Sequence, residues 1–170
     1  SGLTQSADNS GVLQLASGTG NLVTVPAVTG TAMVSGNMPA FSAYNSSATS
    51  LASGTNTQVL FATEDFDTNN NFASSRFTPT VAGYYQLNSA ISIAGGGGAT
   101  EIIAIIYKNG AVFKSGADGG TASFRTVVSS LVYANGTTDY FEIYCYSGAA
   151  RTTEASSSAT WFNGTLVRAA

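Results

Sequence analysis

The chain has 170 residues, of which only 9% are charged, and its formal net charge is −3. Proteins usually carry about 25% charged residues, so this chain either stays soluble through hydroxyl and amide groups or buries much of its surface against partner chains. The six basic residues are scattered and form no patch that would neutralise a run of phosphates, which argues against a nucleic-acid partner. No run of about 20 apolar residues occurs, so we expect no insertion into a membrane.

Residues 1–36 form a segment that differs from the rest of the chain. The segment is polar, rich in turn-forming residues, and lacks aromatic residues, because the first aromatic is Phe41. It cannot build a core of its own. The alternation over residues 12–15 and 22–25 predicts two short strands, and residues 28–34 suggest a weaker one. We therefore expect an extended, β-rich shaft packed against the same segment of other chains, with a flexible linker as the alternative.

The aromatic content rises near Met38, and we expect a head domain over residues 37–170. Branched and aromatic residues dominate its apolar content, which suits β-strands. No helical period occurs, and turn signals recur every 8–12 residues, so nine or ten strands are predicted in an all-β antiparallel sandwich or barrel. The individual strands are expected at residues 39–44, 57–63, 72–77, 84–93, 99–108, 111–114, 124–133, 138–146 and 160–168.

The connections between these strands are predicted from their turn residues. Asn109-Gly110 and Asn135-Gly136 each indicate a tight hairpin, because both residue types tolerate positive φ. Segments rich in Ser, Thr, Asn and acidic residues indicate longer polar loops. These loops are expected at residues 45–56, 64–71 and 147–158.

The strand over residues 84–93 alternates between an apolar face, with Tyr85, Leu87 and Ile91, and a polar or small face. The strand over residues 99–108 is different, because both of its faces are apolar. One face has Ile102, Ala104 and Ile106, and the other has Ile103, Ile105 and Tyr107.

A sandwich strand buries only one face in its own core, so a neighbouring subunit is the simple candidate to cover the second face of residues 99–108. The strand over residues 138–146 also has a tyrosine face, and tyrosine is common at interfaces. We therefore predict a homo-oligomer and leave open which Ile face lies at the axis. The predicted interface residues are Ile103, Ile105, Tyr107, Tyr144 and Tyr146.

The residues that usually carry catalysis are scarce. There is no histidine, and the single cysteine, Cys145, lies in phase with Phe141 and Ile143, which predicts a buried hydrophobic side chain. The common general base and the usual nucleophile pairs are thus excluded, and we expect no enzyme and no cofactor. A hydrolase such as a depolymerase would need a pair of buried carboxylates in a groove.

One acidic cluster has two interpretations. Glu64, Asp65 and Asp67 offer the hard oxygen ligands that calcium prefers. The alternative is a solvated loop, which we favour.

A set of motifs resembles a known family. Pro39–Ala43 reads Pro-Ala-Phe-Ser-Ala, and Phe61, Asp67 and Phe72 follow at characteristic spacings. Phe77, Gly83 and Tyr85 complete the pattern, with Ile106–Gly110 and Phe162–Leu166 further on. Residues 38–168 thereby resemble the globular head of the first complement component, whose jelly roll is shared with the tumour necrosis factor superfamily.

The resemblance implies a ten-stranded antiparallel jelly-roll sandwich that forms tight trimers around a three-fold axis. Some members of the family bind calcium. The sequence departs from the family pattern: the spacing from Phe72 to Phe77 is about two residues short, and Leu87 and Ser89 stand where aromatics are expected. No collagen-like stalk precedes the head, and no ligand residues carry over, so complement function is not implied.

The N-terminal segment has its own resemblance. Residues 2–15 and 23–30 are similar to the repeats that precede the tips of tailed-bacteriophage fibres. This implies a virion location, at the C-terminal tip of a tail fibre or another surface appendage of an environmental or cyanobacterial virus. The N-terminus would connect the head to the rest of the fibre.

Two functions follow from these resemblances. The first is a trimeric receptor-binding tip that attaches the virion to a host cell-surface glycan or protein. The alternative is a structural clamp that trimerises the shaft or decorates the capsid and binds no receptor. For the first function, the candidate receptor contacts on the polar loops are Asn45, Asn56, Asp67, Asn69, Asn70, Asn71, Arg151 and Glu154.

Overall fold

A computed structural model of the chain describes residues 13–16, 22–25, 38–95, 101–118 and 125–170. The chain divides into two compact units, Ser1–Ala32 and Met33–Ala170. In the first unit, β1 (Leu13–Ala16) pairs antiparallel with β2 (Leu22–Val25). The strand expected at residues 28–34 lies outside the described residues. Nothing in the described part of the chain is a helix that could cross a membrane.

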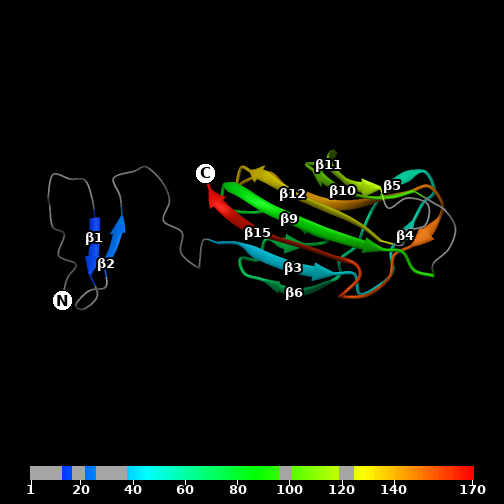
Figure 1. The fold of residues 1–170 in the computed structure, drawn as a ribbon, viewed down its shortest axis with the longest axis horizontal. Helices are drawn as coiled ribbons and strands as arrows, with labels where there is room; N and C mark the ends of the chain where they lie inside the picture. Colours follow the sequence, from blue (N-terminus) through cyan, green and yellow to red (C-terminus); the bar gives the residue numbers. More distant parts are fainter. Residues whose placement is uncertain (1–12, 17–21, 26–37, 96–100, 119–124) are drawn as a thin grey trace. The chain divides into compact units, whose positions relative to one another are not determined.

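The head domain is built from antiparallel strands alone in its described part (Figure 1). In chain order these are β3 (Ala40–Tyr44), β4 (Ser50–Leu51), β5 (Thr55–Gln58), β6 (Thr63–Asp67), β7 (Phe72–Ala73), β8 (Arg76–Phe77), β9 (Gly83–Ser92), β10 (Ile102–Lys108), β11 (Ala111–Asp118), β12 (Arg125–Ala134), β13 (Phe141–Ser147), β14 (Arg151–Thr152) and β15 (Trp161–Ala169).

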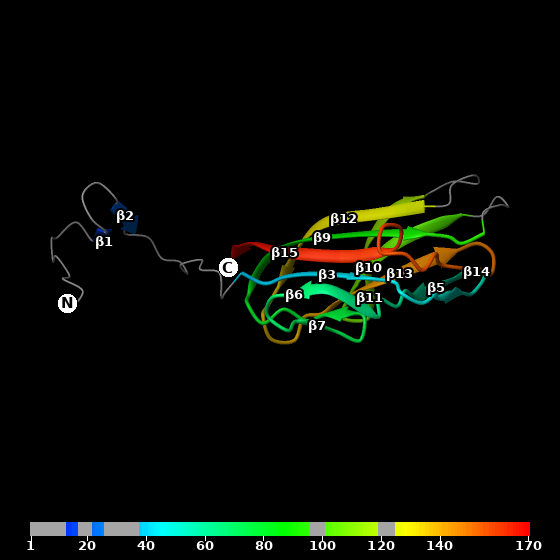
Figure 2. The same cartoon turned by 90° about the horizontal axis from the view of Figure 1, so that it is seen from below.

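Two sheets form the sandwich (Figure 2). The first, here the β9 sheet, has the order β12-β9-β15-β3-β6. The second, here the β13 sheet, has the order β11-β10-β13-β8-β7, and β5 also pairs with β13. β14 and β4 form a separate two-stranded ribbon, and Leu51 of β4 packs into the core. The predicted all-β antiparallel sandwich is confirmed, with five strands along each of the two main paths.

The core lies between the two sheets and follows the alternation of β9. Tyr85, Leu87 and Ile91 are fully buried, whereas Tyr84 on the opposite face is exposed. From the facing sheet, Ile143 and Cys145 of β13 are equally buried. Each fully buried side chain of this size stabilises the fold by roughly 1.5–3 kcal/mol relative to an exposed one, so the two inner faces hold the sheets together.

Aromatic rings fill one end of this core. Phe41 stacks on Phe77 with ring centroids 4.4 Å apart and meets the edge of Phe162 at 4.8 Å. Phe77 also meets Tyr85 edge-on at 5.4 Å. These are residues that carried the family resemblance, and they are buried because they are the packing contacts between the sheets.

The structure shows which of the two apolar faces of β10 is internal. Ile102, Ala104 and Ile106 belong to the core, so Ile103 and Tyr107 look outward. At the end of β10, Asn109 and Gly110 have φ values of 54° and 80°. The hairpin predicted there is confirmed, because β10 and β11 pair across this turn.

The hairpin predicted at Asn135-Gly136 is wrong. β12 pairs with β9 and β13 pairs with β10, so this turn connects the two sheets. The Asn135 side chain holds this turn, in place of hydrogen bonds between paired strands. Its Oδ1 accepts hydrogen bonds from the backbone N–H groups of Thr137, Thr138 and Asp139 at 2.9–3.0 Å. A side chain that caps its own turn allows the chain to change sheets.

The segment over residues 57–67 also differs from the prediction. β5 ends at Gln58 and β6 begins at Thr63, so Glu64–Asp67 is strand and not loop. Between them the chain crosses from the β13 sheet to the β9 sheet. Val59 and Phe61 alternate with exposed Leu60 because both reach the core, and that alternation imitates a continuous strand.

The single strand predicted at residues 72–77 is a tight hairpin of β7 and β8. Its central residues, Ser74 and Ser75, have φ values of 53° and 61°. Positive φ at both central positions defines a type I′ turn, which Asn-Gly usually makes. Here the Ser75 hydroxyl accepts a hydrogen bond from the backbone N–H of Phe61 at 2.8 Å, so a tertiary contact holds the turn.

The loop predicted at residues 45–56 contains β4 and the start of β5. Its polar composition concealed these short strands, because their pairing depends on distant segments and not on local composition. β4 pairs with β14, which lies inside the other long polar loop, over residues 147–158.

Candidate functional site

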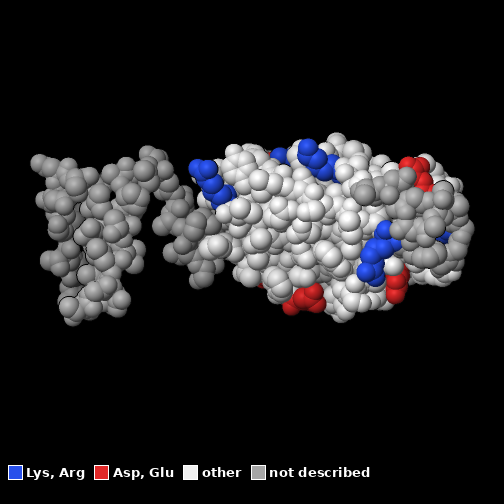
Figure 3. Space-filling view, viewed as in Figure 1, with Lys and Arg blue, Asp and Glu red and all other residues white. Residues whose placement is uncertain are grey.

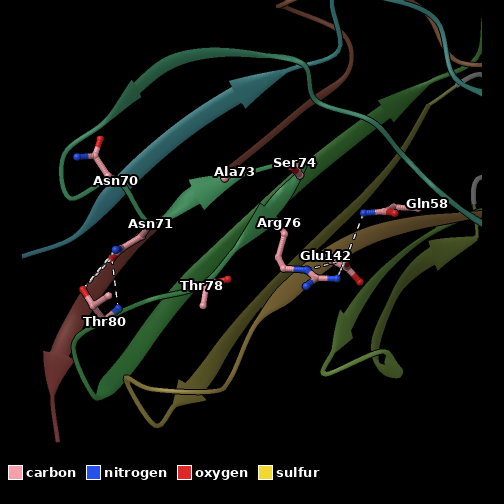
Figure 4. A pocket seen from close by; sticks show the side chains of 9 residues that line it. All are labelled: Gln58, Asn70, Asn71, Ala73, Ser74, Arg76, Thr78, Thr80 and Glu142. Atoms are coloured by element: carbon pink, nitrogen blue, oxygen red, sulfur yellow. Dashed lines mark hydrogen bonds and ion pairs between the residues drawn. The ribbon is translucent and has the colours of Figure 1, made fainter.

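Three polar side chains from three strands converge on the outer face of the β13 sheet (Figure 4). β8 and β5 share one edge of β13, and the register places Arg76 opposite Glu142 and Gln58 opposite Tyr144. Neighbouring side chains on one face of a sheet are close enough to interact. Arg76, Glu142 and Gln58 therefore meet where β8 and β5 approach each other along β13.

Glu142 is the centre of this group. Its Oε1 accepts hydrogen bonds from Arg76 Nε at 2.9 Å and Gln58 Nε2 at 3.3 Å, and Arg76 Nη2 lies 2.8 Å from the same oxygen. Glu142 is only 4% exposed. Among the described residues, no fully buried side-chain nitrogen or oxygen lacks a partner. Oε2, which takes part in none of these bonds, is thus the oxygen that reaches solvent.

Arg76 is held from a second side. Its guanidinium carbon lies 3.9 Å from the centroid of the Tyr140 ring, and its side chain is 46% exposed. A guanidinium held by a ring and a carboxylate keeps its remaining N–H donors in a fixed orientation. Arg76 can therefore offer these donors to a ligand with little loss of conformational freedom.

These side chains line a hollow of about 590 Å³. Such a volume is within the usual range of ligand pockets. The lining holds one positive and one negative group, and the rest of its polar groups are uncharged amides and hydroxyls. The lining residues are Gln58, Asn70, Asn71, Ala73, Ser74, Arg76, Thr78, Thr80 and Glu142.

A pair of tyrosines lies on the same outer face as the hollow. The rings of Tyr107 and Tyr144 stack with centroids 3.8 Å apart and planes 20° from parallel. Tyr107 is the β10 partner of Glu142, and its hydroxyl accepts a hydrogen bond from Asn56 Nδ2 at 2.8 Å. Burial raises the pKa of Tyr144, and the charge of Glu142 raises it further. An aromatic surface thus adjoins the polar hollow.

The five residues predicted to form a subunit interface do lie together on this face. Ile103 pairs with Tyr146, and Ile105 pairs with Tyr144, across β10 and β13. Ile105 is 5% exposed in the single chain, so its own chain already covers it. The other predicted members are half-buried, and an interface on these residues stays a prediction.

The β9 sheet presents a larger exposed apolar surface, which we call the β9 outer face. Residues 83–92, 126–134 and 161–167, which make up most of its three adjacent strands, contain no charged residue. Figure 3, in the view in which β9 and β15 cross the middle of the domain, shows no charged side chain over the centre of the domain, with one basic group to the right of the centre and the other charges nearer the outline. Its exposed large hydrophobic residues, each 41–57% exposed, are Phe66, Tyr84, Val127, Leu131, Tyr133 and Val167.

Polar side chains cross the middle of the β9 outer face. Asn88 Nδ2 donates to Asn163 Oδ1 at 3.1 Å, and Ser129 Oγ donates to Asn88 Oδ1 at 2.8 Å. Gln86 Nε2 donates to the Ser129 hydroxyl at 2.9 Å. This polar strip explains why sequence reasoning missed the surface: its strands read as half-polar, which is the pattern of a solvated face.

Two of the predicted receptor contacts have buried side chains. Asn45 is fully buried, and its Nδ2 donates to the Leu60 carbonyl at 2.6 Å and to the Thr49 hydroxyl at 3.1 Å. Asn71 is 5% exposed, and its Nδ2 donates to the Asn69 carbonyl at 3.1 Å. Both amides brace their own loops, which leaves Asn45 nothing to offer a receptor and Asn71 little.

The remaining predicted contacts are scattered over the domain. Asn70 is exposed and, with Asn71, lines the hollow. Asn56 is exposed in β5, beside the tyrosine pair. Asp67, Asn69 and Arg151 are half-buried, and Glu154 is exposed. The structure therefore brings only two of the eight predicted contacts to the hollow.

The acidic cluster does not converge. Asp67 accepts hydrogen bonds from the backbone N–H groups of Phe72 at 2.7 Å and Asn69 at 3.3 Å, so it braces a turn. Asp65 accepts a hydrogen bond from the Ser42 hydroxyl at 2.8 Å. Within the described ranges, no group of three or more metal-binding side chains lies close enough to hold a metal ion.

Sequence reasoning missed Gln58, Arg76 and Glu142. Arg76 and Gln58 are 66 and 84 residues from Glu142 in the chain, so no local motif joins them. The only available signal was Glu142 itself, a single charge inside the otherwise uncharged strand β13.

Comparison with known proteins identifies the fold of the head domain. No protein-family model matches the sequence, and no curated protein matches it. The globular domain of zebrafish complement 1qA protein matches with a TM-score of 0.58 at 18% identity, over 78% of this chain and 98% of that one. Murine APRIL at pH 8.5 matches with a TM-score of 0.57 at 10% identity, over 76% and 99%.

A third solved structure, the Eiger TNF from S. frugiperda, matches with a TM-score of 0.53 at 7% identity, over 78% of this chain and 93% of that one. At sequence identities this low, the likeness shows a shared fold and not a shared activity. The head domain has the jelly-roll fold of complement-head and tumour-necrosis-factor-like proteins, as the sequence resemblance implied.

Proposed function

We propose that the head domain is a homotrimeric recognition module at the tip of a viral fibre, and that it attaches the particle to a glycan or protein on the host surface. The observation that carries this proposal is the exposed apolar surface of the β9 outer face, over strands that have no charged residue in residues 83–92, 126–134 and 161–167. Exposed apolar patches of this kind mark protein–protein contacts in soluble proteins. The trimer is also what the family resemblance implies.

We assign the subunit contact to the β9 outer face. Leu131 and Val127 are more than half exposed in the single chain. The rings of Tyr84 and Tyr133 pack against each other on the same face, with centroids 5.5 Å apart and planes tilted by 58°. Burying such area contributes roughly 25 cal/mol per Å². Ile105, in the interface predicted from sequence, has almost no area left to bury.

This arrangement leaves the β13 sheet facing solvent. The hollow around Glu142 and the Tyr107–Tyr144 pair would then be on the outside of the trimer, repeated three times. Repeated weak sites on one particle give high avidity without a strong single site. That is the behaviour an attachment module needs.

The fibre context comes from the N-terminal resemblance. The sequences of residues 2–15 and 23–30 resemble segments that precede fibre tips. β1 and β2 lie where the alternation predicted short strands. We do not propose catalysis. Glycoside hydrolysis uses two carboxylates, and the lining of the hollow supplies one, Glu142.

Adsorption competition tests the attachment role. Purified protein is added to susceptible cells before the virus, and a reduction in virus adsorption is expected. A Leu131→Asp variant, expected to be monomeric, should compete much less well because it loses avidity. The absence of cell-surface binding at saturating protein would overturn the proposal in favour of a structural clamp.

A further inference from the structure

We infer that the hollow around Glu142 binds a neutral, hydroxyl-rich ligand: an uncharged sugar unit. This inference rests on the proposed attachment function and names the site and the ligand class that would serve it. It starts from the charge of the lining. Arg76 and Glu142 neutralise each other, and every other polar lining group is an amide or a hydroxyl.

A charged ligand would meet an opposing partner in this hollow. An anionic sugar could pair with Arg76, but its carboxylate would lie beside that of Glu142. A cationic ligand could pair with Glu142, but its positive charge would lie beside the guanidinium of Arg76. A like charge at short range is destabilising, whereas a hydroxyl group can donate to one partner and accept from the other. The pair therefore favours an uncharged ligand.

The atoms of the Arg76–Glu142 pair that remain available can bind two neighbouring hydroxyl groups of one ligand. Glu142 Oε1 is occupied by Arg76 and Gln58, which leaves Oε2 as an acceptor at the solvent boundary. The remaining N–H groups of Arg76 are donors beside it. Two adjacent hydroxyls of a sugar can therefore donate to Oε2 and accept from the guanidinium, and both bonds are charge-assisted.

The site is organised before a ligand arrives. Tyr140 lies under the guanidinium of Arg76, and Gln58 fixes the carboxylate of Glu142. Little conformational entropy is lost when such groups bind, which improves affinity. The Ser74 turn at the rim has positive φ, a conformation that costs energy in a non-glycine residue and is frequent at ligand sites.

An aromatic surface for the apolar face of a second sugar unit lies next to the hollow. Tyr107 is the cross-strand neighbour of Glu142, and Tyr144 is the neighbour of Gln58. Their rings are stacked on each other and half-buried, so the pair forms a rigid platform. A hollow and a platform on one face fit a chain of at least two sugar units.

The first experiment is a titration of the whole protein, followed by amide NMR. The probes are glucose, galactose and mannose, with glucuronic acid and sialic acid as anionic counterparts. We expect shifts with at least one neutral sugar at the amides of Gln58, Ser74, Arg76 and Glu142. Shifts with the acids alone would overturn the neutral class, and the absence of any shift at these amides would overturn the site.

Variants then separate the hollow from the rest of the surface. Gln58→Ala should weaken binding of the neutral sugar roughly two- to ten-fold, the usual effect of losing a hydrogen-bonding neutral group. Glu142→Gln removes a charged acceptor and should weaken it roughly ten- to hundred-fold. Ser50→Ala, at a separate hollow lined by β4 and β14, is the matched control and should change nothing. Equal binding by wild type and Gln58→Ala, with Glu142→Gln also unchanged, would overturn the site.

The adsorption assay distinguishes failure of this site from failure of the attachment role. If the wild type blocks adsorption and Gln58→Ala and Glu142→Gln block equally well, the hollow is wrong and attachment stands. If the wild type does not bind cells, attachment fails, and the sugar titration alone decides the hollow. Cell binding that survives periodate oxidation of glycans but not protease treatment indicates a protein receptor and overturns the sugar assignment.

Discussion

The amide of Asn109 and the carboxylate of Asp139 join two turns at one end of the head domain: Asn109 Nδ2 donates to Asp139 Oδ1 at 2.8 Å. Lys108 Nζ lies 2.9 Å from Asp139 Oδ2, which also accepts the backbone N–H of Asn135 at 3.0 Å. Burial alone would raise the pKa of Asp139. The hydrogen bonds from Asn109, Lys108 and Asn135, with the charge of Lys108, outweigh burial and lower that pKa below its ordinary value.

We expect this group to make the stability of the head depend on pH. The unfolded chain protonates Asp139 near pH 3.8, and the folded chain protonates it at lower pH. The stability that Asp139 contributes is therefore fully present above pH 3.8 and is lost as the pH falls through the folded pKa. Asp139→Asn should lower the free energy of unfolding by about 1–3 kcal/mol at pH 7.

Urea denaturation of wild type and Asp139→Asn across the acid range measures this effect. The difference between the two proteins should shrink as the pH falls below 3.8. Glu154→Gln, at an exposed position, is the control and should show a smaller difference at pH 7. A gap between wild type and Asp139→Asn that stays constant into the acid range would contradict the assignment.

Two variants in the turn between β7 and β8 can distinguish the cost of backbone strain from the contribution of a tertiary hydrogen bond. Ser74→Asn should stabilise the head by a few tenths to about 1 kcal/mol, because Asn tolerates positive φ better than Ser. Ser75→Gly should also relax the backbone but should destabilise the head by about 1 kcal/mol or more, because the Phe61 N–H loses its buried acceptor. Thermal or urea unfolding of the two variants checks the opposite signs.

Gly116 allows β11 to approach β12. A Cβ at this position would clash with the Val127 carbonyl oxygen, so Gly116→Ala requires movement of the backbone. We expect destabilisation of about 1–3 kcal/mol or more. Gly54 is the comparison, because its φ is +70° and a Cβ would meet no atom within 4 Å. Gly54→Ala should destabilise the head by only about 1 kcal/mol, the cost of a non-glycine residue at positive φ. An equal loss of folding stability in both variants would refute the steric argument.

The oligomeric state can be tested with two equally exposed apolar residues on different sheets. Leu131 on β12 is 54% exposed and Val112 on β11 is 56% exposed, so neither change to Asp should disturb the fold of the single chain. We expect Leu131→Asp to give a monomer mass in light scattering at micromolar concentration, and Val112→Asp to keep the wild-type trimer mass. A monomer mass for the wild type would contradict the proposed trimer.

The interface predicted from sequence is tested in the same assay. If Ile103→Asp and Tyr144→Asp dissociate the trimer while Leu131→Asp does not, the subunit contact lies on the β13 sheet. Circular dichroism of each variant shows whether loss of the trimer reflects loss of the fold.

Cys145 offers a chemical probe of global unfolding. Its side chain is fully buried in the core, and burial raises the pKa of its thiol to about 12. The thiolate is the reactive form of cysteine, so we expect Cys145 to react with a disulfide reagent at pH 8 only when the head unfolds. The reaction rate should rise with urea in step with the unfolding transition. Fast labelling of the native protein would show that the core opens locally.

Local pattern was sufficient for much of this fold. The alternation in β9 correctly separated Tyr85 and Leu87 from Tyr84, because successive side chains in a strand always point to opposite faces. Asn109-Gly110 correctly marked a hairpin, because its conformational preference lies in two adjacent residues. The spacing of Phe77, Gly83 and Tyr85 was part of the family resemblance that implied the jelly roll, and the Phe77 and Tyr85 rings do pack in the core between the sheets.

Pairing between distant segments was not readable in the same way. Asn135-Gly136 has the same local preference as Asn109-Gly110, but only the assembled domain sends the chain after it to the other sheet. Asn45 reads as a loop residue, and its burial depends on Leu60 and Thr49, which are placed by other strands.

The candidate site depends most on tertiary structure. Gln58, Arg76 and Glu142 come from three strands, and only the pairing of β8 and β5 with one edge of β13 brings them together. The amino-acid sequence specified a sparsely charged, all-β antiparallel sandwich or barrel with tyrosine-bearing strands, because composition and alternation are local properties of the chain. The tertiary structure decided which apolar surface stays exposed and which polar groups meet, because both depend on contacts between residues far apart in the chain.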